Sequence, residues 1–164
     1  MAKMKSLQDL FINLLKDMYY SEKQILRALP KMAKKADSAE LRRAFEDHLK
    51  ETEGQLERLE QVFALCDTRV AGKTCPAIKG ILEEGEKDLK EATDPDVRDA
   101  GMIADAQAVE HYEIARYGTL IAWAKQLGLN DAARLLHQTL EQEYNADRTL
   151  TQLAEQRLNR QAAA

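Results

Sequence analysis

The feature that most constrains the fold of this chain is a recurrence of apolar residues at steps of three and four along four long stretches. This spacing brings the apolar side chains onto one face of an α-helix. In the stretch 103–124, that face reads Ile103, Gln107, Glu110, Ile114, Tyr117, Ile121 and Ala124. Because an amphipathic helix must bury its apolar face against another element, four such helices predict a bundle.

The composition favours an all-α fold. The 164 residues include only 7 Gly and 3 Pro, and aromatic residues make up 5%. Strong helix formers dominate, whereas turn-rich β architectures need more Gly and Pro than this chain provides. The length suits one domain with one core, so we predict a single domain over residues 1–164.

Turn and capping signals divide the chain into helices. We predict helices over residues 6–35, 38–66, 77–91, 96–126 and 131–158. Short turns join the first two and the last two, which predicts two antiparallel hairpins. The connection between the hairpins is longer and carries the short helix, so it can lead the chain from one end of the bundle to the other. The predicted fold is a ferritin-like up-down four-helix bundle with a long crossover between the helices at 38–66 and 96–126.

Each long helix carries a glutamate where its apolar face should continue. The four residues are Glu22, Glu51, Glu110 and Glu143. Aligning the first with the third, and the second with the fourth, gives a weak internal repeat. Burying a carboxylate is costly unless a positive or hydrogen-bonding group meets it, and several close together need shared protons or cations. Two divalent metal ions, iron or manganese, held between four helices are a known solution.

The second ligands depart from the usual di-iron pattern, in which two helices carry Glu-x-x-His. The histidine positions hold Gly54 and Ala146. Instead, His48, Glu113 and Asp147 each lie one helical turn from one of the four glutamates, on or beside the same face. The expected site is richer in oxygen than the usual one and so more tolerant of manganese.

Roles within the predicted site follow from the neighbours of each acid. Glu51 and Glu143 are the expected bridging ligands, because their helices carry the extra ligand one turn away. Gln55 and Gln107 lie close enough to donate hydrogen bonds to carboxylates, a supporting role that such sites need.

Each residue also has a simpler interpretation. A single glutamate on a helix face usually reaches solvent at the edge of that face, and Glu113 could do the same. His48 could be a hydrogen-bonded core residue rather than a ligand. Four acids at matched height on four helices are harder to explain in this way.

Four stretches of the chain resemble a known family. They are DMYYSEKQILRALPKM, HLKETEGQLERLEQVF, VEHYEIARYGTLIAWAKQLG and TLEQEYNADRTLTQLA, and together they extend from Leu7 to about Leu158. They are similar to the bacterial YciE/YciF-type ferritin-like proteins. The resemblance implies a ferritin-like fold, a dimer, a dinuclear metal centre and a link to stress responses. By position, Glu22, Glu51, Glu110 and Glu143 match the core carboxylates of the family.

Other features restrict the cellular setting. The net charge is −4 with both signs interleaved along the helices, so nothing predicts nucleic-acid binding. The sequence shows neither an apolar run that could span a membrane nor a signal peptide, and we expect a cytoplasmic protein. Cys66 and Cys75 are expected to be free thiols in a reducing compartment.

The sequence therefore supports one main hypothesis of function and two rivals. The main hypothesis is a cytoplasmic homodimer that binds two iron or manganese ions and, if it is an enzyme, oxidises Fe(II) or removes peroxide. The first rival is a metal-independent stress or scaffold protein that binds a protein partner through the bundle surface. The second rival is an iron-storing cage.

Overall fold

The computed structural model describes residues 4–164, and every regular element within that range is helical. In chain order, the elements are α1 (Leu7–Lys35), α2 (Ala39–Leu65), α3 (Pro76–Glu91), α4 (Pro95–Gln126), α5 (Asn130–Leu153), a short π-helical segment η1 (Ala154–Leu158) and α6 (Asn159–Ala162). The predicted all-α class is confirmed. Helix ends lie within one residue of the predicted ends, except in the last helix. There, η1 interrupts the α-helical pattern, and the chain stays helical to Ala162.

Side-chain caps explain where several helices begin. Ser6 accepts a hydrogen bond from the backbone of Asp9 at 3.1 Å, and the Asp9 carboxylate accepts one in return from the backbone of Ser6 at 3.0 Å. This reciprocal pair is a capping box, which satisfies N–H groups that have no partner within the helix. Asp94 caps α4 through its bonds to the backbone of Asp96 and Val97. At the other end of α4, Gly128 adopts a positive φ of 74°, the left-handed conformation that commonly terminates a helix.

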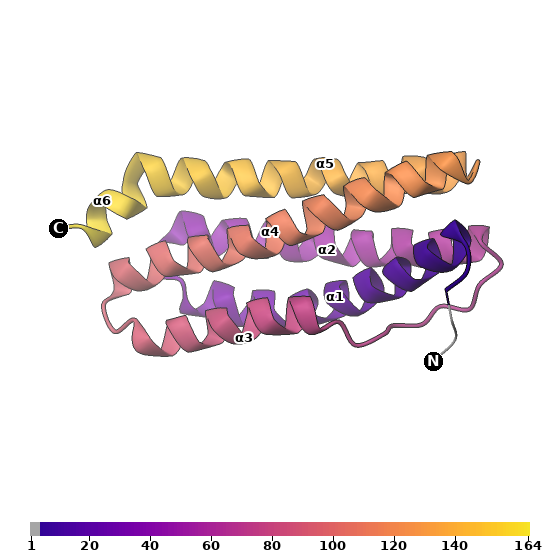
Figure 1. Cartoon of the computed structure of the whole chain (residues 1–164). Coiled ribbons are helices and arrows are strands. Elements are labelled where there is room, and N and C mark those ends of the chain that lie inside the picture. The colour runs from indigo at the N-terminus through magenta and orange to yellow at the C-terminus, as the bar shows by residue number, and fades with distance from the viewer. Residues whose placement is uncertain (1–3) are drawn as a thin grey trace.

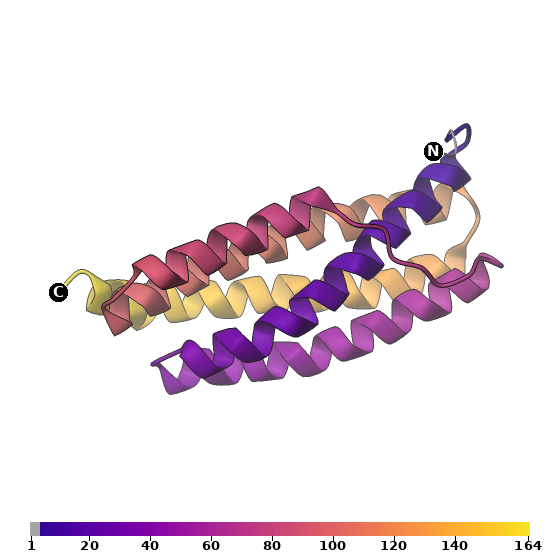
Figure 2. The same cartoon turned by 90° about the horizontal axis from the view of Figure 1, so that it is seen from below.

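The four long helices form an elongated bundle (Figure 1). α1 and α2 run antiparallel, and so do α4 and α5, whereas α2 and α4 point in the same direction. α1 packs against α2 and α4, and α5 packs against the same two helices, so α1 and α5 lie at opposite corners. The view from below shows α3 lying along α4 on the outside of the bundle (Figure 2).

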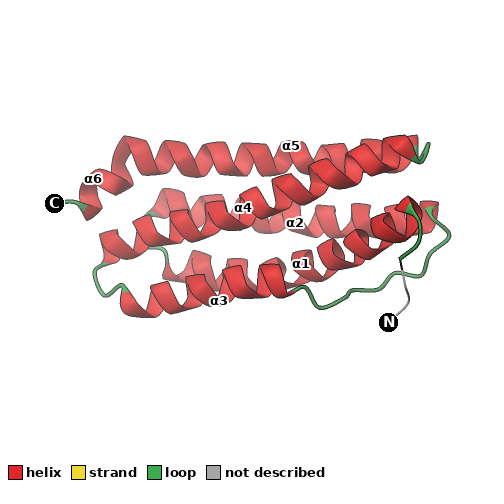
Figure 3. Cartoon of the chain, viewed as in Figure 1, coloured by secondary structure: helices red, strands yellow, loops and turns green. Residues whose placement is uncertain are grey.

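The connection from α2 to α4 has to return the chain to the end at which α2 began. Figure 3 shows that its first part is the longest loop of the fold and that α3 completes the return. This path allows α2 and α4 to be parallel. The predicted long crossover carrying a short helix is therefore present.

The apolar interior consists of two clusters rather than one. One gathers around Ile25, Phe45, Met102 and Leu150, and the other around Phe11, Leu15, Phe63 and Leu136. The two clusters lie on either side of the middle of the bundle. The residues between them along the helices are buried but polar.

Candidate metal centre

A layer of buried polar side chains separates the two apolar clusters. All four long helices contribute to it, and each of its five main members is at most 6% exposed. They are Glu22 from α1, His48 from α2, Glu110 and Glu113 from α4, and Glu143 from α5. Each residue interrupts the apolar face of its helix in mid-course, which is why all five arrive at the same level.

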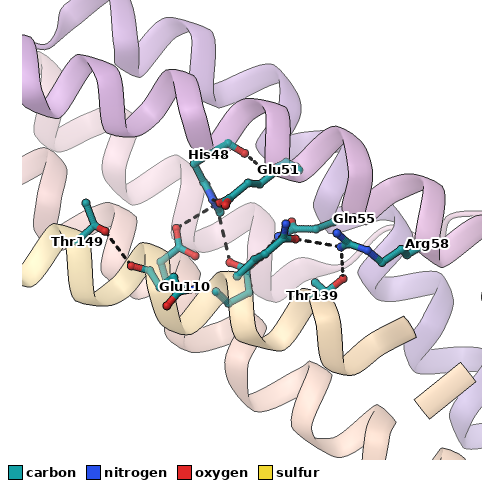
Figure 4. A network of polar contacts seen from close by, with 11 residues as sticks. His48, Glu51, Gln55, Arg58, Glu110, Thr139 and Thr149 are labelled. Atoms are coloured by element: carbon teal, nitrogen blue, oxygen red, sulfur yellow. Dashed lines mark hydrogen bonds and ion pairs between the residues drawn. The ribbon is translucent and has the colours of Figure 1, made fainter. Parts of the chain in front are cut away.

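Four of these residues form a close group. His48, Glu110, Glu113 and Glu143 each offer one nitrogen or oxygen atom, and these four atoms lie within 4.8 Å of one another. The His48 Nε2 atom is 3.3 Å from Glu110 Oε1 and 3.8 Å from Glu143 Oε2. Figure 4 shows the imidazole reaching down from α2 toward Glu110. Imidazole nitrogen and carboxylate oxygen are the donors that iron, manganese and zinc accept in proteins.

Most of these donor atoms lack a hydrogen-bond partner. Within residues 4–164, the buried side-chain atoms of the layer without one are Glu22 Oε2, His48 Nε2, Glu110 Oε2, both oxygens of Glu113, Glu143 Oε2 and Gln55 Oε1. Buried polar atoms are normally paired, and an unpaired one costs about 1–3 kcal/mol. A cation bound among the carboxylates would satisfy several of these atoms together. The donor set therefore fits a metal ion.

The carboxyl groups of the layer resist ionisation. Burial raises the pKa of Glu22 to about 8, and the Glu143 carboxylate contributes in the same direction, although a hydrogen bond from Tyr117 opposes both. Burial also holds the pKa of Glu110 and of Glu113 well above the ordinary value, and the neighbouring carboxylates add to the effect. Without a cation, the layer must therefore retain protons at neutral pH.

The pKa of His48 is also raised, but for a different reason. Burial by itself lowers the pKa of a histidine, but the hydrogen bond to Glu51 and the charges of Glu143 and Glu22 outweigh it, so the pKa of His48 is raised. A protonated imidazole beside these acids partly neutralises the layer. Metal binding has to release this proton and those on the carboxyl groups, because a metal ligand must be deprotonated.

Hydrogen-bond donors hold two of the acids in place. Gln55 donates its side-chain N–H to Glu143, as predicted, and Tyr117 donates its hydroxyl to Glu22. Next to Gln55, the Arg58 guanidinium donates hydrogen bonds to Thr139 at 2.9 Å and to Gln142 at 3.0 Å (Figure 4). Such bonds fix the orientation of a ligand before a metal arrives.

Two of the predicted ligands lie outside the close group. The Glu51 side chain is 39% exposed and meets the layer only through its 3.5 Å contact with His48 Nδ1. Asp147 is paired with His111 at 3.1 Å, and it accepts the predicted hydrogen bond from Gln107 at 3.0 Å. The structure thus brings together Glu22, His48, Glu110, Glu113 and Glu143, and it leaves Glu51 and Asp147 at the edge.

The sequence interpretation missed the role of Tyr117. The helical spacing placed Tyr117 only on the apolar face of residues 103–124, whereas the structure shows it fully buried and donating its hydroxyl to Glu22. Its position four residues after Glu113 on the same helix face was a usable signal. A tyrosine hydroxyl at a fully buried position needs a polar partner, and the nearest ones along the bundle are the acids.

The cysteines play no part in this layer. Both Cys66 and Cys75 are free, as predicted. Cys75 is buried, and its sulfur lies 3.1 Å from the Tyr112 hydroxyl. Within residues 4–164, no helix is both long enough and apolar enough to span a membrane.

Comparison with known proteins identifies the family. Residues 6–163 match the family described as a domain of unknown function, DUF892. The chain is 46% identical over 160 residues to protein YciF of Escherichia coli strain K12, a match that covers 97% of this chain and 96% of YciF. The chain therefore belongs to the DUF892 family.

Solved structures agree with this assignment. The structure of YciF, described as an E. coli stress protein, matches with a TM-score of 0.91 and covers 95% of this chain and 99% of its own. YcfI from Rhodopseudomonas palustris is also 46% identical, with a TM-score of 0.89, over 91% of this chain and 95% of YcfI. A protein from Xanthomonas campestris, 23% identical over 92% of each chain, has a TM-score of 0.75 and shares the fold.

Proposed function

We propose that this member of the DUF892 family is a ferritin-like metal–carboxylate protein that binds two iron or manganese ions in the middle of its bundle and acts in the bacterial stress response. The observation that carries the proposal is the group of four buried donor residues, most of whose facing atoms have no hydrogen-bond partner. Membership of the same family as the E. coli stress protein YciF supports the physiological part.

The residues present divide naturally between two ions. His48, Glu110, Glu113 and Glu143 would hold the first. Glu22 would hold the second, together with oxygen atoms of Glu113 and Glu143 that the first ion leaves free. Glu113 and Glu143 would thus contribute to both ions, whereas the sequence suggested Glu51 and Glu143 for that role.

The chemistry of the donor set favours manganese or iron over softer metals. Four carboxylates and a single imidazole form a hard, oxygen-rich site. When bound, such an ion supplies one-electron redox chemistry toward oxygen or peroxide. The chain's own part is to orient the carboxylates through Gln55 and Tyr117 and to accept and release their protons between two apolar clusters.

Metal titration of the purified protein tests this proposal. Apo-protein prepared with a chelator is titrated with Mn²⁺ and with Fe²⁺ under anaerobic conditions, and bound metal per chain is measured by elemental analysis after gel filtration. We expect two ions per chain and a higher Tm for the loaded protein, because a ligand that binds only the native state stabilises it.

The matched control replaces a glutamate outside the layer. Glu57→Gln on the exposed side of α2 should keep the stoichiometry, whereas Glu143→Gln should lower it. Well below one ion per chain for the unaltered protein, without a change in Tm, would reject the metal proposal and favour the metal-independent scaffold protein.

A further inference from the structure

A cavity of about 170 Å³ lies beside the candidate metal centre, among the four long helices. At one end it is lined by His48 and Glu110, two members of the buried polar layer. Much of the remaining wall is apolar and includes Ile25, Phe45 and Leu150. A space of this size can hold a molecule as large as benzene, since engineered apolar cavities of about 150 Å³ do so.

Small side chains of the four long helices leave space for the cavity at this level. Each long helix contributes one alanine to the wall: Ala28, Ala44, Ala106 and Ala146. Ala44 precedes His48 by one helical turn, Ala106 precedes Glu110 by one turn, and Ala146 follows Glu143 by about one turn. Voids in a core lower stability, and a larger apolar side chain at any of these positions would reduce this one. All four helices therefore leave space at the same place, next to the polar layer.

Unpaired atoms of the polar layer mark the inner end as a binding surface. His48 and Glu110 have side chains only 7% and 4% exposed, and His48 Nε2 and Glu110 Oε2 have no hydrogen-bond partner. In Figure 4, Glu110 and Thr149 lie on one side of His48, and Gln55 and Arg58 lie on the other. Thr149 also lines the cavity, whereas Gln55 and Arg58 do not, so the cavity opens from one side of the layer.

The cavity wall also includes exposed residues of α2 and α5. Asp47, Asn145 and Thr149 line it there, and all three are exposed at the surface. The cavity therefore reaches the molecular surface on this side. Toward α3, the wall includes Met32 and Leu82, which also line a larger cavity of about 490 Å³ between α1 and α3.

The charges of the wall restrict the chemical class of the ligand. Asp47 and Glu51 are acidic and lie on the more exposed part of the wall, and among residues 4–164 the lining contains no lysine or arginine. An anionic ligand would be repelled, whereas a hydroxyl group could donate a hydrogen bond to a carboxylate. We infer that this cavity binds a small, uncharged organic molecule with an apolar body, and that its hydroxyl end faces His48 and Glu110. The position of the hydroxyl group next to a metal ion rests on the proposed function, whereas binding in the cavity does not.

Benzyl alcohol is a suitable probe, with benzoate as its anionic counterpart of similar shape. Binding to the full chain is measured by ligand-observed NMR titration, once with chelator present and once after loading with Mn²⁺. We expect saturable binding of benzyl alcohol in both states. In the chelated protein, benzoate should bind more weakly by about tenfold or more, because the Asp47 and Glu51 carboxylates of the wall repel it.

Variants of the alanines show whether the probe occupies this cavity. Ala106→Leu should weaken benzyl alcohol binding by about tenfold or more, because the leucine side chain takes the place of the ligand. Ala104→Leu is the matched control, since Ala104 lies exposed on the same helix, and it should leave binding unchanged. Ala146→Leu on α5 should repeat the loss. Because Ala106 also lines the larger cavity and Ala146 does not, the Ala146→Leu variant assigns the probe to this cavity.

Paramagnetic relaxation gives the orientation and separates the two proposals. With Mn²⁺ bound, the methylene protons next to the hydroxyl should relax faster than the ring proton opposite them, and Ala106→Leu should abolish the difference. Binding of benzyl alcohol only to the chelated protein, or faster relaxation of the far ring proton, would contradict the stated orientation.

The remaining outcomes are equally distinct. Two ions per chain with no saturable binding of benzyl alcohol would overturn the cavity inference and leave the proposed function standing. Benzyl alcohol binding that Ala106→Leu abolishes, in a chain that binds no metal, would support the cavity inference and reject the metal proposal. Equal loss in Ala104→Leu and Ala106→Leu would overturn the assignment of the probe to this cavity.

Discussion

Glu113 shows, at the scale of a single residue, how this bundle concentrates negative charge. Its side chain is fully buried and both of its carboxylate oxygens lack a hydrogen-bond donor. The nearby Glu22, Glu143 and Glu110 all help to keep its pKa well above the ordinary value, after the larger effect of burial. The ionised form of this buried carboxyl group is therefore unfavourable in the metal-free protein. A cation bound beside it would stabilise that form.

Replacing Glu113 with glutamine should therefore have opposite effects on the two states. Glu113→Gln keeps the shape and removes the charge, so the metal-free protein should have an equal or higher Tm at pH 8. Mn²⁺ affinity should fall by about 10-fold or more, a loss at least as large as that for residues that only support a ligand. Differential scanning fluorimetry with and without Mn²⁺ measures both effects. A loss of Tm in the metal-free protein together with unchanged Mn²⁺ affinity would assign Glu113 a structural role.

The sequence was sufficient to name the candidate residues of this layer. It was not sufficient to decide which of the candidates point into it. Glu22, Glu110 and Glu143 interrupt apolar faces, and the helical spacing was sufficient to place them in the core. His48 and Glu51 lie three residues apart on one helix and share its inward side, so the spacing could not decide between them. The choice depends on how α2 is rotated against α4 and α5, which results from packing of whole helices. The structure turns His48 inward and leaves Glu51 at the edge.

At the scale of the helices, a contact between α4 and the turn from α1 to α2 attaches the first hairpin to the second. Asp99 of α4 is buried and accepts hydrogen bonds from the backbone N–H groups of Asp37 at 3.0 Å and Ser38 at 2.7 Å. These two residues form the turn from α1 to α2. A side chain of α4 therefore satisfies backbone groups that neither helix of the hairpin can satisfy itself.

Loss of this contact should destabilise the protein without affecting the polar layer. Asp99→Ala leaves two backbone N–H groups without their acceptor, and we expect the free energy of unfolding to fall by about 1–3 kcal/mol. Glu53→Ala on the exposed side of α2 is the control and should change it by less than about 0.5 kcal/mol. Urea denaturation of the chelated proteins gives both values. Equal stability of the two variants would show that the turn does not depend on Asp99.

Helix positions were more predictable than helix contacts. Ser6, Ser38 and Gly128 act within a few residues of their own position, so local sequence is enough to place the ends of α1, α2 and α4. The acceptor role of Asp99 links residues 61 and 62 positions apart, and no local pattern reveals it. The π-helical segment η1 near the C-terminus also gave no recognisable signal in the sequence.

At the scale of the whole molecule, the polar layer links folding stability to pH. Glu22 has a pKa of about 8 in the folded protein and an ordinary value of 4.5. Between these values the folded state binds more protons than the unfolded state, so the stability of the metal-free protein falls as the pH rises. The stabilisation contributed by protonated Glu22 is fully present below pH 4.5 and is lost as the pH rises through about 8. The raised pKa of His48 acts in the same direction.

Chelated protein should consequently be more stable at pH 6 than at pH 8. Each carboxyl group that gains a proton on folding contributes a slope of up to about 1.4 kcal/mol per pH unit in this window. Urea denaturation at several pH values measures the slope, and Glu22→Gln should make it shallower. With Mn²⁺ present, the dependence should reverse, because binding requires deprotonated ligands. A metal-free protein that becomes more stable toward pH 8 would show that these acids are already ionised in the folded state.

The central claim is that cations lie between the buried acids of the four helices. Anomalous diffraction from crystals of protein purified without added metal, with data collected at the manganese and iron absorption edges, tests it most directly. We expect anomalous peaks among His48, Glu110, Glu113 and Glu143, with a second peak beside Glu22. Crystals supplied with Mn²⁺ or Fe²⁺ that show no anomalous peak in this layer, while the same acids face one another, would contradict the claim.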